Sequence, residues 1–207
     1  MKLALEEMLQ LDARETLLLV TDIQRDFLES EKGFAFHDAG NDTGNMQAMV
    51  IEHLIPLIIR SLGEATNVAY VKSEYTLGKF EKPYGRLCFK LPGKDFYLID
   101  FVKGAGKAKV FSKSEHDPFT NPNLRRYIEE NKIRNLILTG ITLTHCIDAA
   151  VNSAILIPDL NVVVPEDCVS YRTKRESDAQ GILAGYSSPD NKRVMVVNSN
   201  QIIYKNG

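Results

Sequence analysis

Residues 135–157 read NLILTGITLTHCIDAAVNSAILI, and this stretch gives the strongest indication of the fold class. Residues 136–138 are a short apolar run that predicts a buried strand, and this strand pattern ends at Thr139-Gly140. Small and apolar residues then recur at helical spacing, which predicts a helix. A strand, a turn and a helix in succession are typical of a parallel α/β sheet. Cys146 falls near the start of the predicted helix.

Cys146 has two interpretations. Backbone N–H groups without acceptors and the positive end of the helix dipole favour thiolate over thiol at this position, which makes sulfur a better nucleophile at neutral pH. The alternative is a small apolar side chain packed where the helix meets the sheet, a common place for a single cysteine. A nucleophile needs a base, so the rest of the chain must supply one.

The composition excludes several classes of protein. The chain has 207 residues, enough to bury a core without disulfides, and we expect residues 1–207 to form one domain. Its three cysteines, Cys88, Cys146 and Cys168, are widely spaced and form no CxxC or Cys/His cluster, so neither a disulfide framework nor a zinc site is indicated. We expect no metal and no other cofactor. A net charge of −2 gives no basic surface for nucleic acid.

No segment of the sequence predicts export or membrane insertion. Acidic residues interrupt the apolar positions of residues 1–15, contrary to a secretory signal peptide. No apolar run approaches the roughly 18 residues of a membrane span. We therefore expect a cytoplasmic protein that does not contact a membrane.

Strands and helices alternate along the chain. Further strands are predicted at residues 15–22, 67–72, 108–112, 161–165 and 193–197. Helices are predicted at residues 3–11, 46–62, 123–132 and 173–184, with Pro56 dividing the second of them. Residues 29–44 have the composition of a surface loop, and residues 76–107 show no clear pattern. The alternation predicts a three-layer α/β/α domain around a parallel sheet.

Polar residues follow several of the predicted strands. Asp22 ends the first, Glu74 and Tyr75 follow the second, and Lys113 follows the third. The turn before Cys146 follows the fourth. In parallel α/β folds the ligand site lies beyond the carboxyl ends of the strands, where the strand order reverses. We therefore expect these groups at one edge of the sheet.

Three motifs resemble those of the isochorismatase-like cysteine hydrolases, the superfamily of nicotinamidases, N-carbamoylsarcosine amidases, ureidoacrylate amidohydrolases and isochorismatases. The first is DIQRDF, with Asp22, Gln24 and Phe27. The second is KSEHDPF, with Lys113 and Phe119. The third is GITLTHCID, in which a glycine precedes the cysteine that opens a helix. All three occur in the family's order, each at a strand end.

The resemblance implies a six-stranded, mostly parallel sheet, a homodimer or homotetramer, and a small-molecule substrate. It also implies an Asp-Lys-Cys triad in which Cys146 attacks an amide or carbamoyl carbon and stores the acyl group as a thioester. Asp22 would carry the proton, and Lys113 would stabilise the anions. A cis peptide bond is implied between Ile141 and Thr142, directing backbone N–H groups at the developing oxyanion.

The chain departs from the family at several positions. Nicotinamidases have an Asp-x-His metal motif where this chain has residues 71–75, VKSEY, so we expect no zinc. Leu143 and Thr144 alter the turn before the cysteine, and His116 and Asp117 replace a tyrosine and a serine. These last two residues are either substrate contacts or a local helix start. The candidate substrate-binding residues are Gln24, Phe27, Glu74, Tyr75, His116 and Phe119.

Three functions remain open from the sequence. The first is a metal-independent cysteine hydrolase that cleaves a C–N bond of a small amide, ureido or carbamoyl compound. The second is an isochorismatase-type vinyl ether hydrolase, in which Asp22 does the acid chemistry without the thiol. The third is an inactive oligomeric binding or scaffold protein. The sequence does not specify the substrate.

Overall fold

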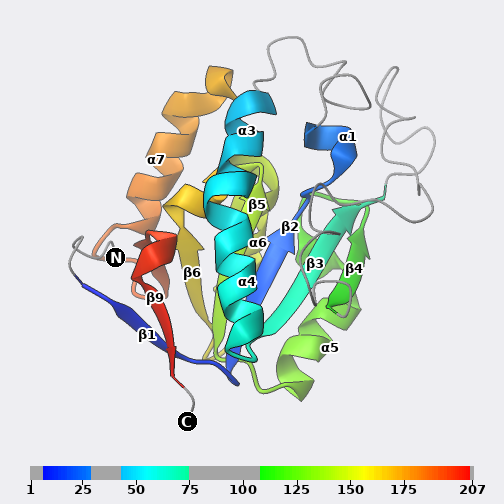
Figure 1. The fold of residues 1–207 in the computed structure, drawn as a ribbon, viewed down its shortest axis with the longest axis vertical. Helices are drawn as coiled ribbons and strands as arrows, with labels where there is room; N and C mark the ends of the chain where they lie inside the picture. Colours follow the sequence, from blue (N-terminus) through cyan, green and yellow to red (C-terminus); the bar gives the residue numbers. More distant parts are fainter. Residues whose placement is uncertain (1–6, 29–42, 75–107, 206–207) are drawn as a thin grey trace.

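The structure is a computed structural model that describes residues 7–28, 43–74 and 108–205 (Figure 1). Residues 29–42 of the loop expected over residues 29–44 lie outside the described residues, as do the unpatterned segment 76–107 and Tyr75. Thr43 and Gly44, also expected in that loop, begin a helix. Everything below concerns the described part of the chain.

A parallel sheet forms the centre of the molecule. Its strands are β2 (Thr16–Thr21), β3 (Asn67–Ser73), β4 (Lys109–Lys113), β5 (Asn135–Ile141), β6 (Asn161–Pro165) and β8 (Val194–Val197). Their order is β4-β3-β2-β5-β6-β8, and a short strand, β7 (Val169–Ser170), also pairs with β5. Every one of these pairings is parallel. The predicted sheet is therefore confirmed, with its order reversing between β2 and β5.

Helices cover both faces of the sheet (Figure 1). One face carries α5 (Pro122–Glu130), α6 (Asp148–Ala154) and α7 (Glu176–Tyr186); the other carries α3 (Thr43–Met49), the π-helical turn η1 (Val50–Leu54) and α4 (Ile55–Gly63). Leu17 and Leu19 of β2 pack under α5 to α7, whereas Leu18 and Val20 pack under α3 and α4. Because both faces are covered, every residue of β2 is buried, which explains its unbroken apolar sequence.

The long helical run over the second face is divided as predicted. The π-helical turn ends at Leu54, and α4 begins with Pro56 in its first turn, where a residue without an N–H is tolerated. By length and composition alone, Gly44–Gly63 could cross a membrane. However, Met46, Leu57 and Ile58 of this run are buried in the core, as expected for a helix packed on a sheet.

The two ends of the described chain pair with each other, contrary to the sequence-based prediction. We expected a helix over residues 3–11, but β1 (Leu9–Asp12) is a strand that pairs in parallel with β9 (Ile202–Lys205). Leu11 is buried while Gln10 is exposed, which is the alternation of a strand. The prediction took residues 3–11 together, and the acidic residues near the start of that segment suggested a helix instead. The strand at residues 193–197 was also wrongly expected to be the last. Pairing with a distant partner, rather than local propensity, fixes these strands.

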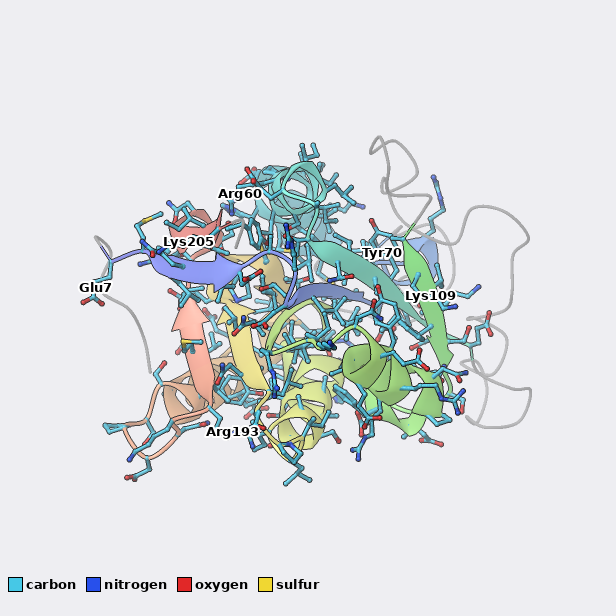
Figure 2. The ribbon with its side chains drawn as sticks, turned by 90° about the horizontal axis from the view of Figure 1, so that it is seen from below. Glu7, Arg60, Tyr70, Lys109, Arg193 and Lys205 are labelled. Atoms are coloured by element: carbon cyan, nitrogen blue, oxygen red, sulfur yellow. The ribbon has the colours of Figure 1, made fainter. Side chains whose placement is uncertain are left out.

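A partly buried arginine lies at the opposite, amino-terminal edge of the sheet. Arg193, labelled in Figure 2, lies just before β8 and donates hydrogen bonds to the carbonyl oxygens of Ile155 at 2.6 Å and Leu160 at 2.9 Å. It also bonds to the carbonyl oxygen of Ile157. These bonds hold the start of β8 to the segment that follows α6.

Candidate active site

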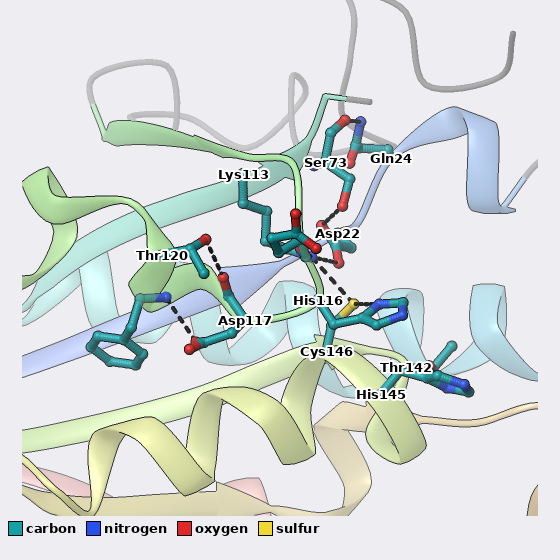
Figure 3. Close-up of polar contacts among 12 residues, drawn as sticks. Asp22, Gln24, Ser73, Lys113, His116, Asp117, Thr120, Thr142, His145 and Cys146 are labelled. Carbon is teal, nitrogen blue, oxygen red and sulfur yellow. Dashed lines mark hydrogen bonds and ion pairs between the residues drawn. The ribbon is translucent and has the colours of Figure 1, made fainter. Parts of the chain in front are cut away.

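The site lies where the strand order reverses. Asp22 directly follows β2, and Cys146 lies in the π-helical turn η6 (Leu143–Ile147) that follows the neighbouring strand β5. Lys113 is the last residue of β4. Figure 3 shows the three side chains converging from these different elements. All three side chains lie at the carboxyl edge of the sheet, as predicted from the strand ends. This is the edge on which α/β folds bind ligands.

The backbones of β2 and β5 approach each other closely at this edge. Gly140 has φ +115°, and a Cβ added to it would lie 2.0 Å from the carbonyl oxygen of Thr21. Only glycine fits such an approach. Asp22, which follows Thr21 directly after β2, has φ 58°. This is a left-handed conformation that aspartate tolerates better than most residues. The expected cis peptide bond between Ile141 and Thr142 is present.

The three residues predicted to form the catalytic triad contact one another, and we call them the buried cluster. Lys113 Nζ lies 2.8 Å from Asp22 Oδ2 and 3.2 Å from Cys146 Sγ. It also donates a hydrogen bond to the carbonyl oxygen of Glu115 at 3.1 Å. Asp22, Lys113 and Cys146 are 2%, 3% and 7% exposed. A buried charge needs such a partner, so the ammonium and the carboxylate stabilise each other beside the sulfur.

A residue that the sequence did not single out holds the carboxylate of Asp22. Ser73 Oγ donates a hydrogen bond to Asp22 Oδ1 at 2.9 Å. Gln24 in turn holds Ser73, because its Oε1 accepts from the Ser73 N–H at 2.7 Å and its Nε2 donates to the Ser73 carbonyl oxygen at 3.2 Å. Gln24 thus sits in a buried pair with the end of β3. The one available signal for Ser73 was its place at that strand end, beside Glu74.

Of the two interpretations of Cys146, the thiolate favoured by the helix terminus is opposed by the surroundings of the sulfur. Burial and the Asp22 carboxylate together raise the pKa of the Cys146 thiol to about 12, although the Lys113 ammonium partly opposes them. The prediction considered the helix terminus and could not include the loss of solvent, which disfavours the charged form. The resting sulfur therefore carries its proton, and its activation requires a base.

Two histidines lie on the other side of the sulfur. His116 Nδ1 is 3.7 Å from Cys146 Sγ, and the rings of His116 and His145 lie 5.3 Å apart (Figure 3). His145 Nδ1 lies 3.2 Å from Thr142 Oγ1 and 3.0 Å from Thr144 Oγ1. Burial, followed by the nearby positive charge of His116, lowers the pKa of His145, which keeps this ring neutral at neutral pH. His145 was not among the predicted site residues, although it directly precedes Cys146.

Asp117 is the start of a local helix. Its Oδ1 accepts a hydrogen bond from the N–H of Phe119 at 2.8 Å and caps the 3-10 turn η5 (Pro118–Thr120). Its Oδ2 accepts from Ser153 Oγ at 2.6 Å. Of the two interpretations left open for Asp117, the structure therefore supports the helix start, whereas His116 beside it faces the sulfur.

The other described candidate substrate-binding residues contact groups other than the Cys146 sulfur. Phe119 and Phe27 are partly buried and pack against the cores on opposite faces of the sheet. Glu74 forms an ion pair with Lys72 at 2.9 Å. Within the described residues, no group of three or more His, Cys, Asp or Glu side chains is arranged to hold a metal ion.

Comparison with known proteins assigns the family. A model of the isochorismatase domain matches residues 16–183, and the chain belongs to the isochorismatase family of hydrolases. It is 23% identical over 184 residues to ureidoacrylate amidohydrolase RutB of Acinetobacter baylyi, covering 78% of this chain and 74% of that protein.

Solved structures agree on the fold. An isochorismatase family protein of Desulfovibrio vulgaris superposes with a TM-score of 0.71 at 20% identity, covering 90% of this chain and 95% of that one. N-carbamoylsarcosine amidase of Thermoplasma acidophilum superposes with a TM-score of 0.68 at 20% identity, covering 90% of this chain and 97% of that one. The chain thus has the isochorismatase-like fold that its motifs predicted.

Proposed function

We propose that this protein is a metal-independent cysteine hydrolase that cleaves a C–N bond of a small amide, ureido or carbamoyl compound. The observation that carries the proposal is the buried cluster: a carboxylate and an ammonium 2.8 Å apart, with the ammonium 3.2 Å from the thiol sulfur. A nucleophile, a proton carrier and a fixed positive charge are the groups that acyl transfer needs.

Asp22 is the proton carrier of the first half-reaction. It accepts the thiol proton as Cys146 Sγ bonds to the substrate carbonyl carbon, and it returns that proton to the nitrogen as the C–N bond breaks. The amine or ammonia leaves neutral, and the acyl group remains on sulfur as a thioester. Because the resting thiol is protonated, this transfer to Asp22 is a required step.

Lys113 and the backbone of the η6 turn stabilise the charges that develop. The ammonium of Lys113 favours the thiolate as it forms, without having to move, because it already contacts the sulfur. The first π-type hydrogen bond of the turn runs from the N–H of Ile147 to the carbonyl oxygen of Thr142. In this proposal the oxyanion donors are the N–H of Cys146, within the η6 turn, and the N–H of Thr142, which follows the cis peptide bond.

The relatives support the class of substrate. One is named a ureidoacrylate amidohydrolase and another an N-carbamoylsarcosine amidase, names that describe cleavage of ureido and carbamoyl C–N bonds. A nucleophilic sulfur suits this chemistry, whereas hydrolysis of a vinyl ether does not require one.

The test is a screen of small amides, ureido acids and carbamoyl compounds for release of ammonia or amine. Any turnover found is then measured in Cys146→Ser and in the control Cys168→Ser, which changes the other described cysteine outside the site. We expect Cys146→Ser to lose at least about 1,000-fold in kcat/KM and Cys168→Ser to keep its activity. Full turnover by Cys146→Ser would reject the proposal and favour acid chemistry at Asp22.

A further inference from the structure

The side of the Cys146 sulfur away from Lys113 is next to an exposed histidine. Lys113 approaches it from the buried side, and both Lys113 and Asp22 are almost fully buried. His116, whose Nδ1 lies 3.7 Å from the sulfur, is an exposed residue. Of the described side chains Lys113, Asp22 and His116 around this sulfur, only His116 is exposed to water.

His116 is held at the sulfur by its neighbours in sequence. On one side, the carbonyl oxygen of Glu115 accepts a hydrogen bond from Lys113 Nζ at 3.1 Å. On the other side, Asp117 Oδ2 accepts a hydrogen bond from Ser153 Oγ at 2.6 Å, and Ser153 lies on α6, the helix that continues from the Cys146 turn. The loop that carries His116 is therefore fastened both to the buried cluster and to the cysteine helix.

We propose that His116 is the general base of the second half-reaction, the hydrolysis of the acyl group from Cys146. The inference rests on the proposed function, since it requires a thioester on that sulfur. It assigns the two half-reactions to different proton carriers: Asp22 on the buried side for acylation and His116 on the solvent side for deacylation.

The step balances without a further reagent. A water molecule attacks the thioester carbon, and its proton passes to the imidazole of His116 as the C–O bond forms. The tetrahedral intermediate then collapses, the C–S bond breaks, and the imidazolium returns the proton to Cys146 Sγ. The products are the free acid and the resting thiol. Sulfur needs this proton, because its surroundings disfavour the thiolate.

The surroundings of His116 suit an imidazole that gains and loses a proton. His145 faces it at 5.3 Å between ring centres, and the hydroxyls of Thr142 and Thr144 lie at His145 Nδ1. Burial, and after it the charges of His116, Arg172 and Arg175, lower the pKa of His145, so this ring stays neutral and adds no charge beside His116. On the buried side of the sulfur, Lys113 and Asp22 are paired with each other.

The experiment uses p-nitrophenyl acetate, whose leaving group departs as a phenolate and needs no proton from Asp22, so that only the deprotonation of the thiol by Asp22 remains in the acylation step. Rapid-quench peptide mass spectrometry follows both the appearance and the loss of acetyl on Cys146 in the wild type, His116→Gln and His116→Ala. His53→Gln is the matched control, because His53 lies near Asp167 on the other face of the sheet. We expect both His116 variants to acetylate like the wild type and to lose acetyl about 100-fold more slowly.

Added imidazole supplies a second readout. It should speed the loss of acetyl in His116→Ala, where the side chain is missing, and leave the wild type and His53→Gln unchanged. Equal rates of acetyl loss in the wild type and both His116 variants would overturn the role of His116 while leaving the proposed function standing. A wild-type protein that never acetylates Cys146 would overturn the proposed function and this inference with it.

Discussion

The two described cysteines, Cys146 and Cys168, are both buried thiols beside a carboxylate, yet their surroundings differ. Burial raises the pKa of each, and Asp22 and Asp167 raise it further. Lys113 lies 3.2 Å from the sulfur of Cys146, and an exposed histidine lies on its other side. Cys168 is fully buried in the core under α3 and α4.

The carboxylates are also used differently. Both carboxylate oxygens of Asp167 accept hydrogen bonds from Ser199. Oδ1 accepts from the Ser199 N–H at 2.8 Å, and Oδ2 accepts from Ser199 Oγ at 2.7 Å. Asp22 instead shares its second oxygen with the ammonium that touches the sulfur. A thiol and a carboxylate are therefore not enough for a nucleophile: a cation at the sulfur and access from solvent distinguish the Cys146 site.

The largest expected effect on stability comes from removing that cation. Lys113→Met leaves the Asp22 carboxylate buried without its ammonium partner, so the free energy of unfolding should fall by about 3–5 kcal/mol. Urea denaturation measures it. The control, Lys72→Met, removes the lysine of the less buried ion pair with Glu74 and should cost less than Lys113→Met.

A second substitution makes this prediction sharper. Adding Asp22→Asn to Lys113→Met removes the stranded charge and should restore part of the lost stability. A double variant less stable than Lys113→Met alone would contradict the account of the ion pair.

The next effect concerns the backbone that brings Asp22 to Cys146. Gly140→Ala places a Cβ against the carbonyl oxygen of Thr21 at a positive φ, so the protein should lose about 1–3 kcal/mol of stability. Gly181→Ala is the control on α7, where an added Cβ has nothing within 4 Å and helix propensity predicts a gain of about 0.5–1 kcal/mol. Thermal denaturation of both variants checks the difference. Equal stabilities would mean that the close approach of β2 and β5 is easily relieved.

The smallest effect belongs to the Cys168 region. Asp167→Asn weakens the bonds from Ser199 and should cost about 1–2 kcal/mol. Cys168 should stay unreactive towards iodoacetamide in the native protein, because the substitution opens no path from solvent. Peptide mass spectrometry after alkylation reports this directly. Rapid native-state labelling of Cys168 in Asp167→Asn would show that the carboxylate, and not burial, protects it.

The sequence predicted the parts of the fold and site that depend on local pattern. The apolar run of β2 ended at Asp22, and the succession of strand, turn and helix around Cys146 was predicted correctly because each period lies within a few residues. The predicted break at Thr139-Gly140 was wrong, since β5 continues to Ile141. Lys113 followed from its place at the end of β4. The family resemblance added the cis peptide bond before Thr142, which no local pattern indicates.

The rest depended on contacts between distant parts of the chain. β1 was predicted as part of a helix, because the strand that fixes it lies at the other end of the sequence. Ser73 and His145 acquire their roles only when the edge of the sheet brings them to Asp22 and His116. The burial that raises the pKa of Cys146 is likewise a property of the folded molecule, absent from any local pattern.

The most direct test of the central claim is the pH dependence of iodoacetamide alkylation at Cys146 in the wild type and in Asp22→Asn. The account predicts that the wild-type sulfur reaches half of its maximal reactivity well above the pH of about 8.5 typical of a free thiol. Asp22→Asn removes a charge that raises the pKa while leaving Lys113 in place, so its profile should shift to lower pH. A wild-type profile at or below that of a free thiol, or one that Asp22→Asn leaves unmoved, would contradict the claim that a buried, protonated thiol is coupled to Asp22.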